Sequence, residues 1–202
     1  MTTVADGATD LHAPVRYDSD PDLLATVLRV YKVHCRYLTS AMVTRDGRDG
    51  GGLRVRGEFD IPESCYIDDT GHFNSVEFNI CYNQMLYYLV AKSIKERLLP
   101  AFADWTLADY WAQQLPNFFI ATFESAFRTP MRGRRFFGEL ALRKVRLRED
   151  PVRPRPMIWL QTTCGYWEDS GGRCDGAVLV AVRQDGPATN GADSAGAAGA
   201  EA

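Results

Sequence analysis

The sequence lacks the features that mark a membrane-spanning or secreted protein. Its first 14 residues contain neither a basic start nor an apolar core, so we expect no signal sequence and a cytoplasmic location. The longest apolar stretch, within residues 74–97, is interrupted by charged and amide side chains well short of the roughly 20 apolar residues that a transmembrane helix needs. We therefore expect no contact with a membrane.

Cysteine and histidine are also few, and they are scattered. The three histidines do not cluster, and no CxxC pair occurs. Widely spaced cysteines in a cytoplasmic chain are typical of reduced, mostly buried thiols. We therefore expect neither a disulfide framework nor a metal site, and no bound cofactor. The five cysteines are Cys35, Cys65, Cys81, Cys164 and Cys174.

Neither end of the chain is expected to fold. Residues 185–202 contain no large apolar side chain and cannot offset the entropy lost on ordering. Residues 1–18 begin with an acidic, Ala/Thr-rich stretch and are predicted to be disordered as well. The remaining residues, 19–184, are enough for a single domain.

The small net charge of −3 conceals an uneven distribution. Residues 128–155 carry ten Lys and Arg against three acidic residues, a local charge of +7 that leaves −10 on the rest of the chain. Such a segment is either a solvated strand face or a docking surface for an anionic cofactor or carrier protein. Nucleic acid ranks last and is not expected as a partner, because no recognised nucleic-acid-binding motif accompanies the charge.

The first part of the chain predicts a short helix followed by a β-hairpin. Ser19-Asp20-Pro21 is typical of a helix start, and helical periodicity continues to about Tyr31. Residues 37–44 and 53–60 are predicted strands joined by an Asp/Gly-rich turn.

The rest of the chain predicts a long buried helix, 74–97, a short helix, 107–115, and four strands. The strands are 117–127, 134–148, 157–167 and 174–183. Within 117–127 we expect Phe119, Ala121, Phe123 and Phe127 to share one face. In 134–148 the apolar residues change from even-numbered to odd-numbered positions near Arg143–Lys144, which predicts a β-bulge there. One buried helix with about six antiparallel strands is an α+β layout, in outline the hotdog fold, in which the sheet wraps the helix.

The start of the long helix carries the polar groups that could perform chemistry. A helix N-terminus offers free N–H groups to an anion or a polarised carbonyl, and His72 or Glu77 could act as a base. Asn74 and Glu77 also fit a capping box, a structural role that can coexist with catalysis. Asn79 and Asn83 lie on one helix face, whereas Glu77 and Asn83 project about 120° apart, so one face cannot present both.

Several motifs resemble the FcoT-type fatty acyl thioesterases, a hotdog family from actinobacteria. The resemblance covers most of residues 22–183 and implies acyl thioester substrates, on coenzyme A or an acyl carrier protein, and homo-oligomers built from dimers, up to a hexamer. The motifs are Tyr66-Ile67, Thr70-Gly71-His72-Phe73-Asn74-Ser75-Val76-Glu77, Cys81-Tyr82-Asn83-Gln84, Cys35-Arg36-Tyr37-Leu38, Ala108-Asp109-Tyr110 and Phe127-Arg128 with Pro130.

Members similar to this chain, in isonitrile lipopeptide pathways, add glycine to the β-carbon of a (2E)-enoyl carrier protein and release a 3-(carboxymethylamino) fatty acid. The resemblance implies functional roles for Tyr31, Tyr66, Asn74 and Asn83. For glycine addition we expect Asn74 and Tyr66 to polarise the thioester and His72 or Glu77 to move protons. We expect Arg36 or Arg128 to hold the glycine carboxylate, and Asn79 to bind substrate beside Asn83.

Two other functions remain open. A long-chain fatty acyl-CoA thioesterase needs only a polarised carbonyl and an activated water. A non-catalytic module that binds an acyl carrier protein through the basic strands needs neither.

Overall fold

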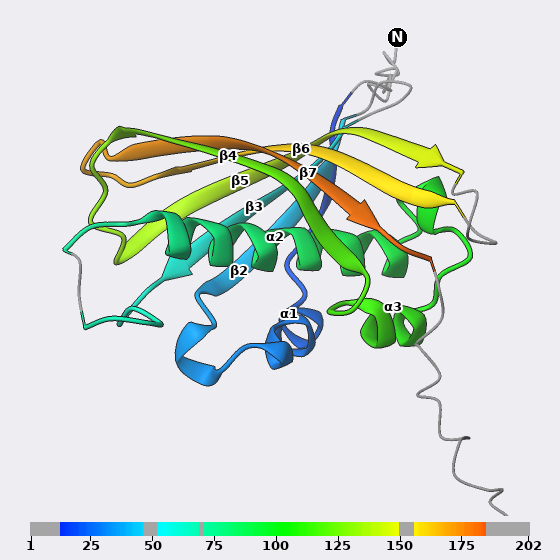
Figure 1. Cartoon of the computed structure of the whole chain (residues 1–202), viewed down its shortest axis with the longest axis horizontal. Coiled ribbons are helices and arrows are strands. Elements are labelled where there is room, and N and C mark those ends of the chain that lie inside the picture. Colours follow the sequence, from blue (N-terminus) through cyan, green and yellow to red (C-terminus); the bar gives the residue numbers. More distant parts are fainter. Residues whose placement is uncertain (1–12, 47–51, 69–70, 150–155, 185–202) are drawn as a thin grey trace, which may run out of the picture.

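The computed structural model describes residues 13–46, 52–68, 71–149 and 156–184 (Figure 1). The expected disorder of residues 185–202 and of the first 12 residues lies outside this part of the chain. Residues 13–18, predicted as part of a disordered N-terminus, instead contain a strand, β1 (Val15–Tyr17), which pairs with β2 (Leu38–Arg45). Three residues are too few to show an alternation of apolar and polar side chains in the sequence. The strand forms because it can pair with the edge of β2.

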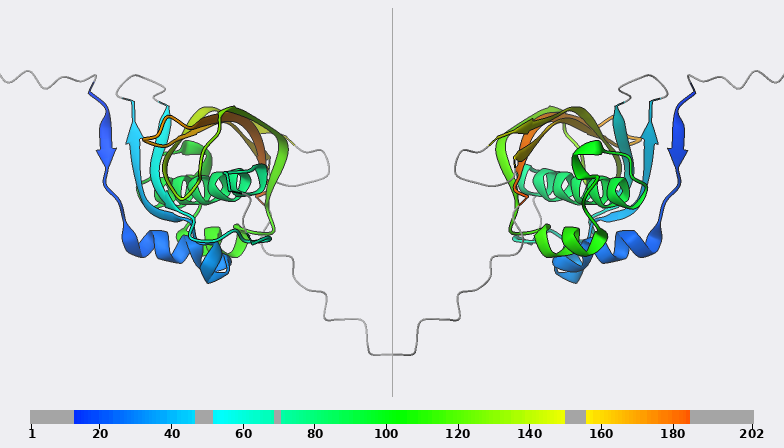
Figure 2. Two further views of the ribbon diagram at one scale, coloured as in Figure 1. Left: turned by 90° about the vertical axis from the view of Figure 1, so that its left-hand side faces the viewer. Right: turned by 90° about the vertical axis from the view of Figure 1, so that its right-hand side faces the viewer.

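A seven-stranded antiparallel sheet, in the order β1-β2-β3-β5-β6-β7-β4, makes one layer of the described molecule. Viewed end-on, it curves around a single long helix (Figure 2). This is the predicted α+β hotdog arrangement. The other strands are β2 (Leu38–Arg45), β3 (Leu53–Asp60), β4 (Phe118–Thr129), β5 (Arg135–Arg148), β6 (Met157–Trp167) and β7 (Arg173–Val182).

The long helix, α2 (Ser75–Lys95), fills the concave side of the sheet (Figure 1). Residues 84–94 are buried without exception, as expected for a stretch that is apolar nearly all round. Towards its start, Phe78 lies at the centre of an aromatic cluster, which ties the helix to the loop before it and to two strands. The other rings of the cluster are Phe73, Phe123, Phe127 and Tyr166.

Two short helices cover part of the other side of α2. In α1 (Pro21–Val27), Asp20 caps the N-terminus by accepting from the Leu23 N–H at 3.1 Å, and a 3₁₀ turn continues the helix to Val30. In α3 (Leu107–Gln113), the Tyr110 hydroxyl donates to the Tyr87 carbonyl on α2 at 2.9 Å. None of the described helices is long and apolar enough to cross a membrane.

The β-bulge predicted near Arg143–Lys144 is confirmed, because the register between β5 and β6 shifts between Leu142 and Lys144. The expectation that Phe119 shares one face of β4 with Phe123 and Phe127 is wrong. The register with β7 shifts between Ile120 and Thr122, so Phe118 takes the inward position and Phe119 is 43% exposed. Apolar residues occupy consecutive positions in this strand, so odd-numbered and even-numbered side chains are equally suited to the buried face. The sequence pattern therefore does not reveal the extra residue of the bulge.

Candidate active site

The start of α2 is built as a capping box. The Asn74 side-chain oxygen accepts from the N–H groups of Val76 at 2.9 Å and Glu77 at 3.2 Å, and the Glu77 carboxylate accepts from the Asn74 N–H at 3.4 Å. These bonds use two of the free N–H groups that the helix start offers. Ser75 is the first residue of the helix, so its N–H has no acceptor within the helix and can donate to a developing oxyanion.

A small cavity of about 20 Å³, enough for one water molecule, lies beside this helix start. It brings together His72 and Glu77, two of the predicted site residues, and the Glu77 side chain is 5% exposed. The residues that line it therefore include a histidine, acidic residues, a serine and arginines. Besides His72 and Glu77 the walls include Ser64, Asp68, Arg132 and Arg134.

Ser64 places a buried hydroxyl at this cavity. Its Oγ atom is shielded from solvent and has no hydrogen-bond partner among the described residues. A buried hydroxyl without a partner costs free energy, and a ligand that hydrogen-bonds to it would remove that cost.

The arginines reach the cavity from the segment between β4 and β5. The Phe73 N–H donates to the Met131 carbonyl at 2.9 Å, which fixes this segment against the residue before the helix. Gly133 is required for the close approach, because its φ is +75° and a Cβ there would lie 3.0 Å from the Phe73 Cβ. Arg132 and Arg134 thus flank the helix start.

Sequence reasoning missed these two arginines as site residues. They lie far from residue 73 along the chain, and only the tertiary contact brings them to α2. The signal that could have found them is Arg132-Gly133-Arg134 after Pro130, a glycine between two cations just past a strand end.

A second polar group lies further along α2. The Asn83 amide donates to the Asn79 side-chain oxygen at 3.1 Å, and both residues are half-buried. The Tyr31 ring lies 6.4 Å from that of Tyr87, and burial raises the pKa of Tyr31, so its hydroxyl keeps its proton and can donate. As the helix geometry predicts, this group does not share a face with Glu77.

Gln84, on the Glu77 side of the helix, is fully buried and serves the fold. Its Oε1 accepts from the N–H groups of Tyr37 and Leu38, and its amide donates to the Cys35 carbonyl at 2.6 Å. These bonds hold the start of β2 against α2.

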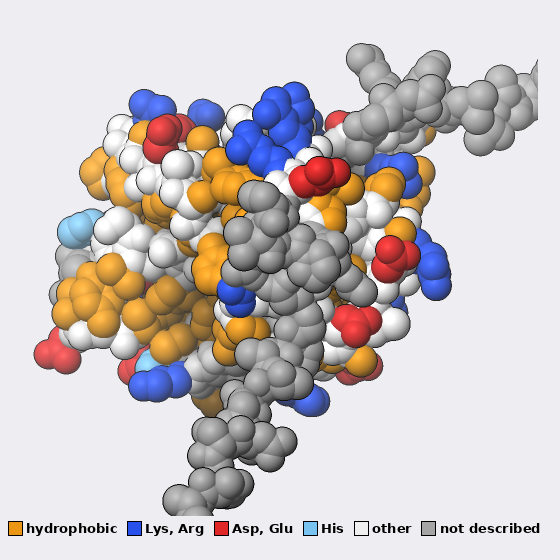
Figure 3. All heavy atoms as spheres, turned by 45° about the vertical axis from the view of Figure 1, so that its right-hand side comes forward, with side chains coloured by type: hydrophobic (Ala, Val, Ile, Leu, Met, Phe, Trp, Pro, Cys, Tyr) orange, Lys and Arg blue, Asp and Glu red, His pale blue; other side chains and the backbone are white. Residues whose placement is uncertain are grey.

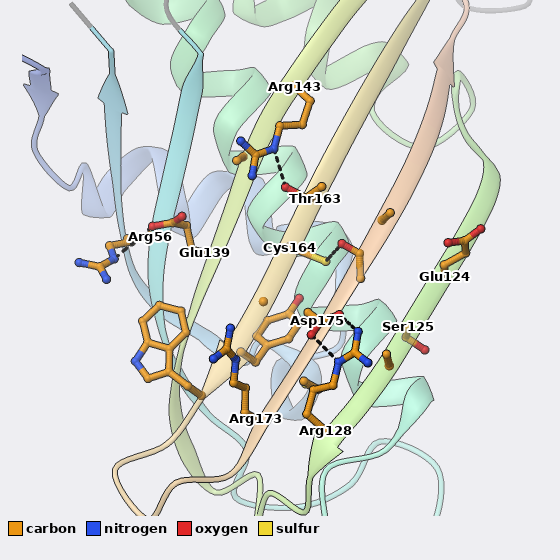
Figure 4. A pocket seen from close by; sticks show the side chains of 18 residues that line it. Arg56, Glu124, Ser125, Arg128, Glu139, Arg143, Thr163, Cys164, Arg173 and Asp175 are labelled. Carbon is orange, nitrogen blue, oxygen red and sulfur yellow. Dashed lines mark hydrogen bonds and ion pairs between the residues drawn. The ribbon is translucent and has the colours of Figure 1, made fainter.

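Seven of the nine predicted site residues, all except His72 and Glu77, are not among those that line the cavity. Tyr66 is 50% exposed on the loop before α2, and Arg36 donates to the Tyr31 carbonyl at 3.1 Å. Arg128 makes a bidentate ion pair with Asp175 at 2.8 and 3.0 Å, on the outer face of the sheet with α2 behind it (Figure 4). The outer face carries a groove of about 850 Å³ whose arginines include Arg56 and Arg143.

The basic segment is divided between the two ends of β5. Arg132 and Arg134 lie at the helix start, whereas Lys144, Arg146 and Arg148 line a groove at the other end of the strand. Lysine and arginine side chains are visible along the upper edge of the molecule in Figure 3, where Figure 1 places the sheet. Within the described residues, no three His, Cys, Asp or Glu side chains gather as a metal site requires, and all five cysteines are free.

A family model for the FcoT-like thioesterase domain matches residues 26–182. The chain belongs to this family. A relative in Streptomyces coeruleorubidus, named (2E)-enoyl-ACP glycyltransferase, is 54% identical over 164 residues, which cover 81% of this chain and 96% of the relative. A protein of the same name in Mycobacterium marinum is 35% identical over 164 residues, 80% of this chain and 85% of the relative.

Among solved structures, this FcoT-like chain is similar to a candidate thioesterase from Shewanella oneidensis. The identity is 9% and the TM-score is 0.42, and the match covers 80% of this chain and 97% of that one.

Proposed function

We propose that this FcoT-like chain is an enzyme that adds glycine to a (2E)-enoyl group on an acyl carrier protein and then hydrolyses the thioester. The product is a 3-(carboxymethylamino) fatty acid, as in isonitrile lipopeptide biosynthesis. The observation that carries the proposal is the 54% identity to a relative named (2E)-enoyl-ACP glycyltransferase, across 96% of that relative. The helix start supplies the groups that the chemistry needs.

In the addition step, the glycine amine must be neutral to act as a nucleophile. Glu77 or His72 takes a proton from the glycine ammonium, and the amine lone pair then forms the bond to the β-carbon. The electron pair of the C=C bond moves towards the thioester oxygen, and the α-carbon takes up a proton. In hydrolysis, water adds to the carbonyl and the C–S bond breaks, which releases the carrier thiol.

The helix start stabilises the charge that develops on the thioester oxygen. The Ser75 N–H donates to it, since Asn74 already occupies the next two N–H groups. Tyr66 and the Asn74 amide assist from the loop and the cap. The second polar group, Asn79 and Asn83 with Tyr31, binds the substrate along the helix, and Arg36 donates to the Tyr31 carbonyl.

The active form in this proposal is a homo-oligomer built from dimers. Among the described strands, β4 has a neighbour on one side only, and its twelve residues include the exposed Phe119 and Ile120. A long edge strand with exposed apolar residues favours pairing with a second strand. A second copy paired with β4 would lie close to the start of α2, where Phe123 and Phe127 of β4 contact Phe78, and could complete the site. A cytoplasmic location completes the proposal.

The test is to incubate the purified protein with a (2E)-enoyl carrier protein, with and without glycine, and to follow the products by mass spectrometry. We expect a glycine-dependent adduct followed by release of the free acid. Release of acid without any glycine adduct would favour the alternative, a long-chain fatty acyl-CoA thioesterase, which an acyl-CoA substrate would test directly. If the protein binds the carrier protein but never converts its enoyl group, only the function of a non-catalytic binding module remains.

A further inference from the structure

We propose that Arg132 is the residue that binds the carboxylate of glycine, with the Ser64 hydroxyl as a second donor. This inference rests on the proposed function and names the group that selects an amino acid over other amines. It replaces Arg36 and Arg128, which the sequence suggests for this role.

The first support is that Arg132 has its charge available. Its backbone N–H donates to the Glu168 carboxylate at 3.1 Å, but its guanidinium group has no hydrogen-bond or ion-pair partner among the described residues. The arginines around it are engaged. Arg134 donates to the Pro62 carbonyl, Arg135 lies 3.6 Å from Asp60, and Arg128 is paired with Asp175.

The second support is the buried Ser64 hydroxyl at the same cavity. A carboxylate oxygen that entered the cavity would accept a bond from this hydroxyl and a charge-assisted bond from Arg132. The cavity volume of about 20 Å³ suits one water-sized group such as that oxygen.

The third support is that the cavity carries charges of both signs. Asp68 and Glu77 line it together with Arg132 and Arg134. Free glycine is a zwitterion whose ammonium and carboxylate groups are joined by a single carbon. A carboxylate that takes the proton from nitrogen and a guanidinium that holds the other end must therefore lie close together, as they do here.

The test compares glycine with glycinamide, which has the same amine but a neutral amide in place of the carboxylate. Adduct formation on the (2E)-enoyl carrier protein is measured for the wild type, Arg132→Gln, Arg132→Lys and the control Arg135→Gln. Arg135 is the matched control because it is exposed, lies three residues further along the chain and is paired outside the cavity.

We expect Arg132→Gln to raise the KM for glycine roughly 10- to 100-fold, the range for loss of a hydrogen bond to a charged group. The preference for glycine over glycinamide should disappear in this variant, remain in part in Arg132→Lys and remain in full in Arg135→Gln. Ser64→Ala should raise the KM for glycine while it raises the melting temperature of the free protein, because it removes an unpaired buried hydroxyl.

An Arg132→Gln variant that keeps the wild-type preference would overturn the assignment. An equal loss in Arg135→Gln would overturn it as well, since the effect would then be one of general charge. If the wild type itself forms no glycine adduct, the proposed function fails first, and this inference fails with it.

Discussion

Glu77 caps the start of α2 and is also a proposed base, and one substitution separates the two roles. Gln at this position still accepts the Asn74 N–H, so Glu77→Gln should change the free energy of unfolding by less than about 0.5 kcal/mol. It cannot take a proton from glycine, and the rate of adduct formation should fall at least about 100-fold. Thermal melts and single-turnover mass spectrometry measure the two effects.

The matched control removes the cap instead. Asn74→Ala should lower the free energy of unfolding by about 1 kcal/mol, because two N–H groups lose their acceptor. If Glu77→Gln keeps the wild-type rate of adduct formation, Glu77 is only a capping residue, and His72 becomes the base to test by substitution with Ala.

Among single residues, the sequence predicts local partnerships better than distant ones. The capping box could be predicted because Asn74 and Glu77 are three apart on one helix. Arg132 could not be predicted as a site residue, because its place depends on the bond between Phe73 and Met131, which lie far apart along the chain. The sequence shows that a cation is present but not which side of the sheet it faces.

At the scale of the elements, a charged contact joins α1 to α2. Asp20, the N-cap of α1, accepts from Lys95 and lies 3.9 Å from the Lys92 ammonium. The Lys95 ammonium and the Leu23 N–H hold the pKa of the Asp20 carboxyl below its usual range. The ionised form therefore stabilises the fold above the unfolded pKa of about 3.9, and this contribution is lost as the pH falls through the lower folded pKa.

Asp20→Asn keeps the cap acceptor but removes the charge. At pH 7 the variant should melt a few degrees below the wild type, and the difference should shrink to nothing as the pH is lowered past the pKa of Asp20. Melting temperatures measured from pH 7 to about pH 2 test this. If the difference in melting temperature persists in acid, the charge of Asp20 is not what stabilises the contact between the two helices.

The residue Arg97, just after the end of α2, has an unfavourable backbone conformation that glycine would adopt without strain. Arg97 follows the helix with φ +54°, where an L side chain is unfavourable, and the next N–H, of Leu98, donates to the Ser93 carbonyl at 2.8 Å. Arg97→Gly should raise the free energy of unfolding by about 0.5–1 kcal/mol in a urea titration. Arg97→Ala retains the unfavourable φ and should give no gain. An equal gain in both variants would attribute the effect to the lost side chain.

How well an element can be predicted from the sequence depends on whether its two faces differ in polarity. In β5, apolar residues alternate on both sides of residue 143, so the change of parity reveals the bulge. In β4, apolar residues occupy successive positions, and the shift near Ala121 leaves no trace in the pattern. The long helix has no such ambiguity, because its apolar stretch is too long for one strand and has no glycine or proline.

At the scale of the whole molecule, the two halves of the basic segment cannot serve one small site. With a rise of about 3.3 Å per residue, Arg146 lies roughly 35 Å along β5 from Arg135. The helix start of this chain is therefore served by Arg132 and Arg134. The far groove, with Lys144, Arg146 and Arg148, is a separate surface whose distance from the helix start favours the solvated-face interpretation.

The proposed dimer can be tested through the edge strand β4. Ile120 is 37% exposed on this strand, and a lysine there opposes strand pairing by placing a charge on the contact. We expect Ile120→Lys to shift sedimentation towards the monomer and to lower adduct formation in parallel, because the site lies beside the proposed partner. Val15→Lys places the same charge on β1, at the opposite edge of the described sheet, and should leave both measurements unchanged. An Ile120→Lys protein that sediments like the wild type would show that β4 does not form the interface, and a fully active monomer would show that one chain completes the site alone.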